Sequence, residues 1–147
     1  MARYLVDTNV LLRTVQIDSE GADLALSAVS ALFARSEVLF VTPQVIIEFW
    51  AVATRPVDVN GLGLTPVVTA QRVEEFLQRF DLLSDQTRVF TYWRALVERY
   101  ERKGKQVHDA RLVAVMQAHG VEHLLTFNVD DFKAYTDIKA MHPAEVS

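Results

Sequence analysis

The 147-residue chain lacks three features, and each absence narrows the range of functions. It has no cysteine, so neither disulfide bonds nor cysteine-bound zinc can hold the fold or supply its chemistry. The apolar run near its start is too short for a signal peptide or a membrane span, which predicts a cytoplasmic protein without a membrane partner. Basic residues do not outnumber acidic ones. The 15 Lys and Arg stand against 19 Asp and Glu, and the net charge of −4 gives no sign of nucleic-acid binding.

The overall amino-acid composition is typical of a folded globular protein. Half of the residues are hydrophobic and 23% are charged, proportions far from those of disordered chains. A chain of this size buries roughly 68–70% of its unfolded surface, which is enough for a core without cross-links. We therefore expect one domain over residues 1–147.

Short β-type runs alternate along the chain with longer segments of helical periodicity. Strands are expected over 3–7, 37–41, 122–127 and 137–141, and helices over 8–15, 21–35, 43–54, 65–80, 85–100 and 109–120, with Thr42, Asp85 and Gly120 at helix ends. This alternation predicts an α/β fold with a central, mostly parallel sheet between two layers of helices. In such sheets ligands bind beyond the carboxyl ends of the strands.

Acidic residues occur where the expected strands end and the helices begin. Asp7 closes the first strand, Glu48 is the only charge in the apolar run "VIIEFWAV", and Asp109 begins the helix "DARLVAVMQ" on its buried side. A purely structural role remains open for each residue. Asp7 and Asp109 could cap helices, and Glu48 could face water or pair with Arg55.

The combination of these acids favours a shared site. Two unit charges about 4 Å apart at an effective dielectric near 20 repel by roughly 4 kcal/mol, so Asp7, Glu48 and Asp109 gathered at one edge need a counter-ion. Oxygen ligands in an open acidic site suit Mg²⁺ or Mn²⁺ rather than zinc. The sequence therefore predicts a divalent cation as cofactor.

Three segments, in their order along the chain, resemble the PIN-domain family. They are "YLVDTNVLL", "TPQVIIEFWAVATRP" and "VHDARLVAVMQAHGVEHLLTFNVDDF", and together they span nearly the whole chain. The resemblance implies a PIN-like three-layer α/β/α sandwich. It also implies a metal-dependent endoribonuclease that hydrolyses RNA phosphodiester bonds, most often as the toxin of a VapC-type toxin–antitoxin pair. A housekeeping PIN nuclease without an antitoxin is the alternative within the family.

The family's pattern carries over to individual positions of this chain. Asp7, Glu48 and Asp109 would form the acidic core that binds the metal and carries catalysis. Many members have Asp where this chain has Asn128, and Asp131 could take up part of that catalytic role. The resemblance also implies supporting roles for four polar residues, which are Thr8, Asn9, Thr126 and Asn128 itself.

The resemblance further implies partners. RNA needs positive charge near its backbone, and the basic residues near the site segments are candidates for that contact: Arg13, Arg55, Lys105, Arg111 and Lys133. A cognate antitoxin is expected from the VapC likeness. The apolar excess of the helices "VEEFLQRF" and "VFTYWRALVERY" suggests a homodimer.

Three other classes of protein are alternatives to a PIN nuclease. A dehalogenase-like phosphatase needs a second Asp two positions after the first, where Asn9 stands, and a receiver domain needs a late-strand Lys that "LLTFN" lacks. A PIN-like binding module that no longer cleaves RNA is the serious rival, and Asn128 is the one feature that supports it.

Overall fold

The computed structural model describes residues 1–146, which form five strands, six α-helices and three 3₁₀ turns. The strands are β1 (Arg3–Val6), β2 (Val38–Val41), β3 (Asp81–Leu82), β4 (His123–Leu125) and β5 (Lys139–Met141). The helices are α1 (Thr8–Val15), α2 (Ala22–Ala34), α3 (Pro43–Thr54), α4 (Pro66–Arg79), α5 (Thr87–Arg99) and α6 (Gln106–His119). The 3₁₀ turns are η1 (Val57–Val59), η2 (Val129–Phe132) and η3 (Pro143–Glu145). Across residues 1–146, every helix falls short of the length and apolar character that a membrane span requires.

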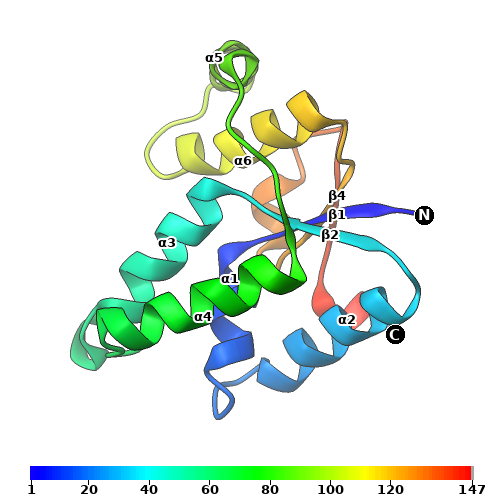
Figure 1. Ribbon diagram of the computed structural model, residues 1–147. Coiled ribbons are helices and arrows are strands. Elements are labelled where there is room, and N and C mark those ends of the chain that lie inside the picture. The colour runs from blue at the N-terminus through cyan, green and yellow to red at the C-terminus, as the bar shows by residue number, and fades with distance from the viewer. Residues whose placement is uncertain (147) are drawn as a thin grey trace.

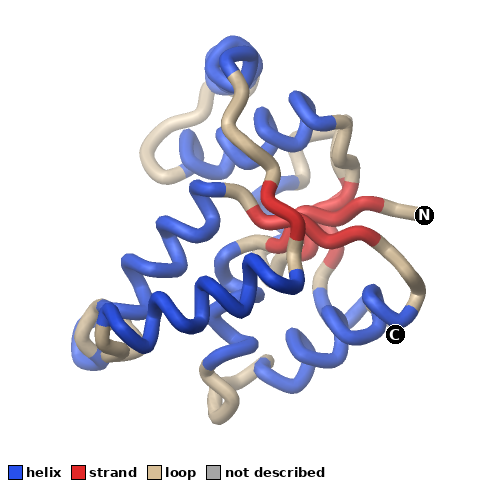
Figure 2. Tube along the Cα trace, viewed as in Figure 1, coloured by secondary structure: helices blue, strands red, loops and turns tan. Residues whose placement is uncertain are grey.

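The five strands form one sheet in the order β3-β2-β1-β4-β5, and every neighbouring pair is parallel. The chain extends the sheet from β1 to one side through β2 and β3, and then to the other side through β4 and β5. Right-handed crossovers therefore place α1 to α4 on one face and α5 and α6 on the other. Figures 1 and 2 show this arrangement, with the strands between two layers of helices. The predicted three-layer α/β fold is confirmed.

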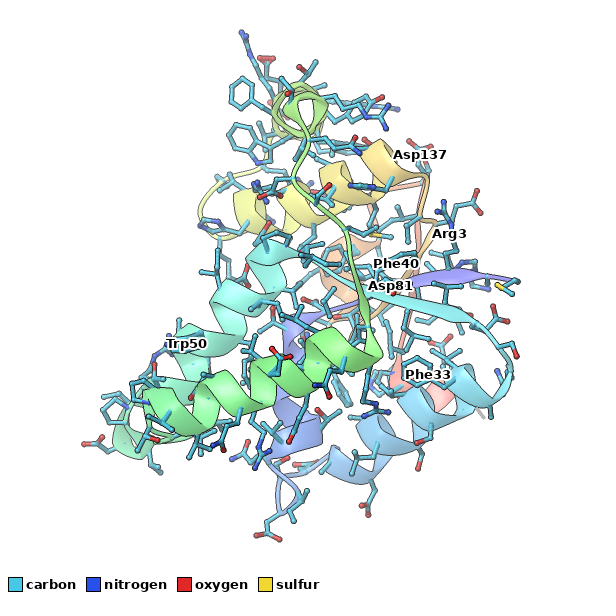
Figure 3. All side chains as sticks on the ribbon, in the orientation of Figure 1. Arg3, Phe33, Phe40, Trp50, Asp81 and Asp137 are labelled. Carbon is cyan, nitrogen blue, oxygen red and sulfur yellow. The ribbon has the colours of Figure 1, made fainter. Side chains whose placement is uncertain are left out.

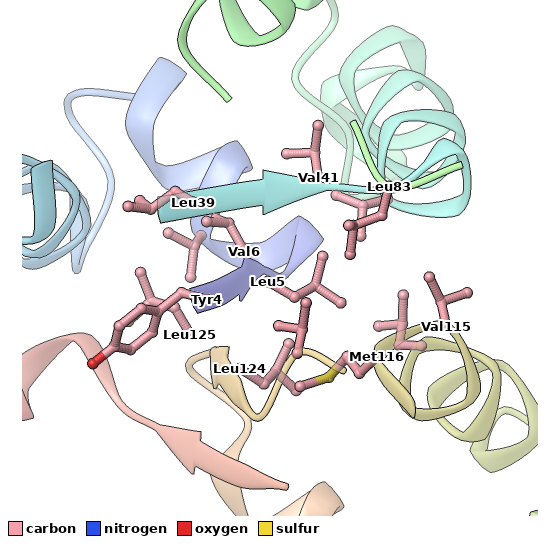
Figure 4. Packing of buried hydrophobic residues seen from close by; sticks show 14 of the residues in the cluster. Tyr4, Leu5, Val6, Leu39, Val41, Leu83, Val115, Met116, Leu124 and Leu125 are labelled. Carbon is pink, nitrogen blue, oxygen red and sulfur yellow. The ribbon is translucent and has the colours of Figure 1, made fainter. Parts of the chain in front are cut away.

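The core lies on both faces of this sheet. Leu5 of β1 and Leu124 of β4 are fully buried, and Met116 of α6 lies against Leu124 in Figure 4. On the opposite face Phe49 of α3 meets Phe76 of α4 edge-on, with ring centroids 5.0 Å apart. Each such side chain contributes roughly 1.5–3 kcal/mol when it is removed from water, so packing on both faces holds strands of only two to four residues.

Aromatic packing extends from this core to the edge of the molecule. Phe33 of α2, labelled in Figure 3, stacks on Phe80 with ring centroids 5.7 Å apart. The guanidinium of Arg79 lies over both rings. These contacts fix α2 against the end of α4, on the face of the sheet that also carries α1 and α3 (Figure 1).

Three local expectations from the sequence differ from the structure. The strand β3 was not expected, because its two exposed residues are too few to show an alternating pattern. The prediction that Asp85 caps the next helix is wrong, since α5 begins at Thr87 and the Asp85 carboxylate instead pairs with Arg111. Helix α6 begins at Gln106 rather than Asp109.

The early start of α6 has a backbone cause. The N–H groups of Val107 and His108 donate to the carbonyls of Gly104 (3.2 Å) and Lys105 (3.0 Å), which closes a turn three residues before the expected start. Asp109 therefore lies within the first turn and is not the capping residue. The helix ends as predicted at Gly120, whose φ of +67° suits glycine.

Candidate active site

Asp7 lies at the carboxyl end of the central strand β1 and is the only acid among the buried residues of the part of the chain that the structure describes. Its side chain is 7% exposed. The residue also caps α1, because its Oδ1 accepts a hydrogen bond from the Thr8 N–H at 2.7 Å. The helix-capping role that the sequence left open for Asp7 is confirmed, and the carboxylate faces the positive end of the helix.

A polar clamp ties this carboxylate to the end of β4. The hydroxyl of Thr126, fully buried, donates to Asp7 Oδ2 at 2.9 Å and accepts from the Asn9 amide at 3.1 Å. The Asn9 carbonyl oxygen accepts from the Phe127 N–H at 3.0 Å, and the Asn128 N–H donates to the Thr126 hydroxyl at 3.0 Å. Two neighbouring strand ends are therefore joined through side chains, and Asp7 has a fixed orientation.

Glu48 is half-buried in the second turn of α3, and its partner is an amide rather than Arg55. Gln44, one helical turn earlier, donates from Nε2 to Glu48 Oε1 at 2.8 Å and to the carbonyl of His108 at 2.9 Å. The Gln44 oxygen accepts from Arg111 at 3.2 Å. Gln44 thereby connects the start of α3 to the start of α6 and holds the Glu48 carboxylate beside it.

The four acids expected at the site act on one another electrostatically. The pKa of Asp7 is raised to about 6, chiefly by burial and also by the charges of Glu48 and Asp109, while the hydrogen bonds from Thr126 and Thr8 act to lower it. Burial also raises the pKa of half-buried Asp109 to about 6, followed by the charge of Asp131, while Lys105 acts in the opposite direction.

The acidic side chains lie farther apart than the ligands of a closed metal site. Within residues 1–146, no three carboxylate or imidazole groups lie close enough to hold one ion together. Asp7, Glu48 and Asp109 as ligands of a common cation therefore stay a prediction, which the mutual repulsion of their charges supports. Donors of this kind fit Mg²⁺ or Mn²⁺, because Mg²⁺ keeps several of its own waters and needs only one or two carboxylates.

The remaining acidic turn lies at the same edge. Asp131, exposed on η2, is the strongest charge acting on Asp109. Asn128 precedes this turn and is exposed, and only its backbone N–H reaches the Thr126 clamp. The neighbouring Asp130 pairs with Lys133 at 2.7 Å and is turned to solvent.

Some of the candidate RNA-binding side chains form hydrogen bonds or ion pairs within the protein, and others do not. Arg13 donates to the Glu20 carbonyl at 2.6 Å and lies over the Phe127 ring at 4.6 Å. Arg111 is held by Asp85 and Gln44. Within residues 1–146, Arg55 and Lys105 are the two candidates whose side chains make no ion pair or hydrogen bond.

The connection through Gln44 is the feature that the sequence analysis missed. Its spacing of four residues from Glu48 places the two side chains on one helix face, and that spacing was readable from the sequence. The contacts to His108 and Arg111, which lie more than 60 residues away along the chain, have no local sequence signal.

The strand order and the acids at the ends of β1 and β4 belong to a recognisable class of fold. Residues 4–138 match the PIN domain family, and the chain belongs to that family. Among curated proteins it is similar to Ribonuclease VapC48 of Mycobacterium tuberculosis, with 24% identity over 139 residues that cover 93% of this chain and 94% of the relative.

Solved structures show the same fold at lower identity. VapBC2 from Rickettsia felis, bound to a DNA fragment from its promoter, aligns with a TM-score of 0.71 at 14% identity, over 95% of this chain and 98% of that one. The sarcin–ricin loop-cleaving toxin VapC20 of Mycobacterium tuberculosis aligns with a TM-score of 0.66 at 18% identity, over 90% and 95%. A toxin–antitoxin complex from Klebsiella pneumoniae aligns with a TM-score of 0.65 at 22% identity, over 95% and 97%.

Proposed function

We propose that the protein is a Mg²⁺- or Mn²⁺-dependent endoribonuclease and the toxin of a type II toxin–antitoxin pair. The observation that carries the proposal is the buried Asp7 carboxylate, which is oriented by Thr126 at the end of β1 and coupled electrostatically to Glu48 and Asp109. A carboxylate kept in such a place opposes folding unless a cation offsets it. The likeness to a VapC ribonuclease supplies the substrate class.

The residues have separate tasks in this proposal. Asp7, Glu48 and Asp109 would hold the cation, with Asp131 close enough to add charge to Asp109. When bound, the cation supplies charge neutralisation at the phosphate and a water of lowered pKa. Thr126 and Asn9 orient Asp7, and no nucleophilic side chain is required.

Cleavage assays with matched variants test the enzyme proposal. Structured RNAs are incubated with the protein, with and without Mg²⁺ or Mn²⁺, alongside Asp7→Asn and the control Asp23→Asn, an exposed acid on α2. We expect metal-dependent cleavage by the wild type and by Asp23→Asn only. Equal cleavage by the wild type and Asp7→Asn would refute the proposed site. Mn²⁺ binding without cleavage of any RNA would favour the binding-module alternative that Asn128 supports.

The partner proposals rest on different observations. An antitoxin is proposed because the fold aligns with chains from VapBC and other toxin–antitoxin complexes. A small DNA-binding protein encoded next to this gene, and its co-purification with the protein, would support the toxin assignment. Its absence would favour a nuclease without an antitoxin.

A homodimer is proposed from the apolar residues that the helices leave uncovered. Phe76 of α4 and Leu96 of α5 are buried within their own chain, but Val67 and Leu77 of α4 are 70% and 42% exposed. Sedimentation of the purified protein is expected to give twice the mass of one chain. A single-chain mass at micromolar concentration would contradict the dimer.

A further inference from the structure

A pocket of about 440 Å³ lies between α5 and α6. These two helices form the layer that covers the face of the sheet opposite α1 to α4 (Figure 1). Its volume is in the range of pockets that bind small organic ligands. Its lining includes Gln86, Thr87, Phe90 and Trp93 at the start and along α5, and His108 and Arg111 on α6. The pocket is separate from the clamp around Asp7 but shares an element, α6, with Asp109.

One wall of the pocket is aromatic and partly rigid. The indole of Trp93 donates from Nε1 to the Val107 carbonyl at 2.8 Å, which ties its plane to the start of α6. Phe90 lies one helical turn earlier, with its ring centroid 5.8 Å from that of Trp93 and a tilt of 35° between the planes. Phe90 is 63% exposed, so much of its ring is open to a ligand.

The polar end of the pocket leads to the candidate active site. His108 directly precedes Asp109 in the first turn of α6. Arg111 lines the pocket and donates to Gln44, which in turn holds Glu48. A ligand between Phe90 and Arg111 therefore sits next to the residues that would meet a scissile phosphate.

We propose that this pocket binds one unpaired nucleobase of the RNA substrate. The proposal rests on the proposed ribonuclease function for the identity of the nucleic acid. Proteins that bind single-stranded RNA stack bases on aromatic side chains and on planar arginine guanidinium groups, and the pocket presents both in Phe90, Trp93 and Arg111. The side chains of Gln86 and Thr87 at its rim offer hydrogen-bonding groups to a base edge.

Fluorescence of Trp93 reports on the pocket without any cleavage. The only other tryptophan of the sequence is Trp50 on α3 (Figure 3). The experiment therefore uses the Trp50→Phe variant, in which tryptophan emission comes from Trp93 alone. Single-stranded RNA tetranucleotides and the same tetranucleotides lacking one base are titrated in EDTA. We expect the intact probes to quench emission and to bind about 5- to 150-fold more tightly than the abasic ones, the range that stacking of one base gives.

Variants on one helix separate the pocket from general surface effects. Phe90→Ala should remove most of the preference for intact over abasic probes, and Phe90→Tyr should restore it. The matched control Tyr92→Ala changes an exposed aromatic residue of α5 that does not line the pocket, and it should leave the preference intact. Equal affinity for intact and abasic probes, or an equal effect of both alanine variants, would overturn the proposal.

The oligomeric state and the cleavage assay distinguish the remaining outcomes. If Phe90→Ala converts a dimer to a monomer in sedimentation, the pocket is a contact between protein chains and the base-binding proposal fails. If the wild type shows base-dependent quenching but cleaves no RNA, the ribonuclease proposal fails while the nucleobase pocket stands.

Discussion

The amide of Gln44 uses both of its protons on the candidate site, one on Glu48 Oε1 at 2.8 Å and one on the His108 carbonyl at 2.9 Å. Its oxygen faces Arg111, which can only donate, so the orientation of the amide is determined. Arg111 is in turn paired with Asp85 at 3.2 Å. A residue outside the predicted acid set therefore decides where the Glu48 carboxylate points.

This connection predicts that Gln44→Leu weakens metal binding. Leucine keeps much of the side-chain volume but leaves Glu48 unheld, and loss of a partner that orients a ligand typically costs 10- to 100-fold in metal affinity. We expect about a tenfold or larger loss of Mn²⁺ affinity by calorimetry. Gln117→Leu on α6, which removes a hydrogen bond to Asp137 away from the acids, is the control. Unchanged affinity in Gln44→Leu would show that Glu48 is positioned without Gln44.

Asp109→Asn is expected to stabilise the protein when divalent ions are absent. Burial and the charge of Asp131 both disfavour the ionised carboxylate of Asp109, and the neutral amide removes that cost. Because the side chain is only half-buried, solvent screens part of the effect. We expect a rise in Tm of roughly 2–4 °C in EDTA at pH 7.5. Adding Mn²⁺ should raise the Tm of the wild type more than that of the variant, and no Mn²⁺ shift in the wild type would count against the metal site.

The sequence was sufficient for the features that local patterns encode. The strand ending at Asp7, the capped helix after Thr42, the helix stop at Gly120 and the edge strand near Met141 all follow from residue type and periodicity. The contacts that could not be predicted from the sequence join residues that are distant along the chain. The bond from Thr126 to Asp7 spans 119 residues, so only the resemblance to a family could suggest it.

Contacts between distant residues also explain why the predicted cap at Asp85 and the predicted start of α6 are wrong. Asp85 looks like a helix cap because its local sequence permits one, but Arg111 on α6 competes for its carboxylate. The start of α6 is set by backbone bonds around Gly104, a glycine whose φ of +59° continues the turn toward the helix. The spacing of the acids is likewise a tertiary property, and their open arrangement cannot be deduced from strand-end positions.

The raised pKa of Asp7 predicts how stability changes with pH. The carboxyl titrates near 3.8 when exposed and near 6 in the folded protein, because burial disfavours its charge. Between these values the folded state keeps a proton that the unfolded state has lost, so the free energy of unfolding falls as pH rises from about 4 to about 6. The contribution amounts to at most about 3 kcal/mol.

Urea denaturation in EDTA between pH 4 and pH 8 measures this dependence. Asp7→Asn lacks the titrating group, so the difference in unfolding free energy between the variant and the wild type should grow over that window and level off above pH 6. A difference that is independent of pH would mean that the Asp7 carboxyl titrates normally. Mn²⁺ should reduce the difference, because a bound cation favours the ionised form.

Thr126→Val tests whether the clamp that orients Asp7 also serves the site. The substitution keeps the shape of the side chain but removes a hydroxyl that donates to Asp7 and accepts from Asn9 and Asn128. Buried polar groups left without a partner cost about 1–3 kcal/mol, so a loss of unfolding free energy in that range is expected, together with a further rise in the pKa of Asp7. Thr126→Ser retains the hydroxyl and should keep both the stability within about 1 kcal/mol and the Mn²⁺ affinity. If Thr126→Val lost stability but bound Mn²⁺ and cleaved RNA as the wild type does, the clamp would serve the fold alone, and the orientation of Asp7 would have to come from the Thr8 N–H at the start of α1.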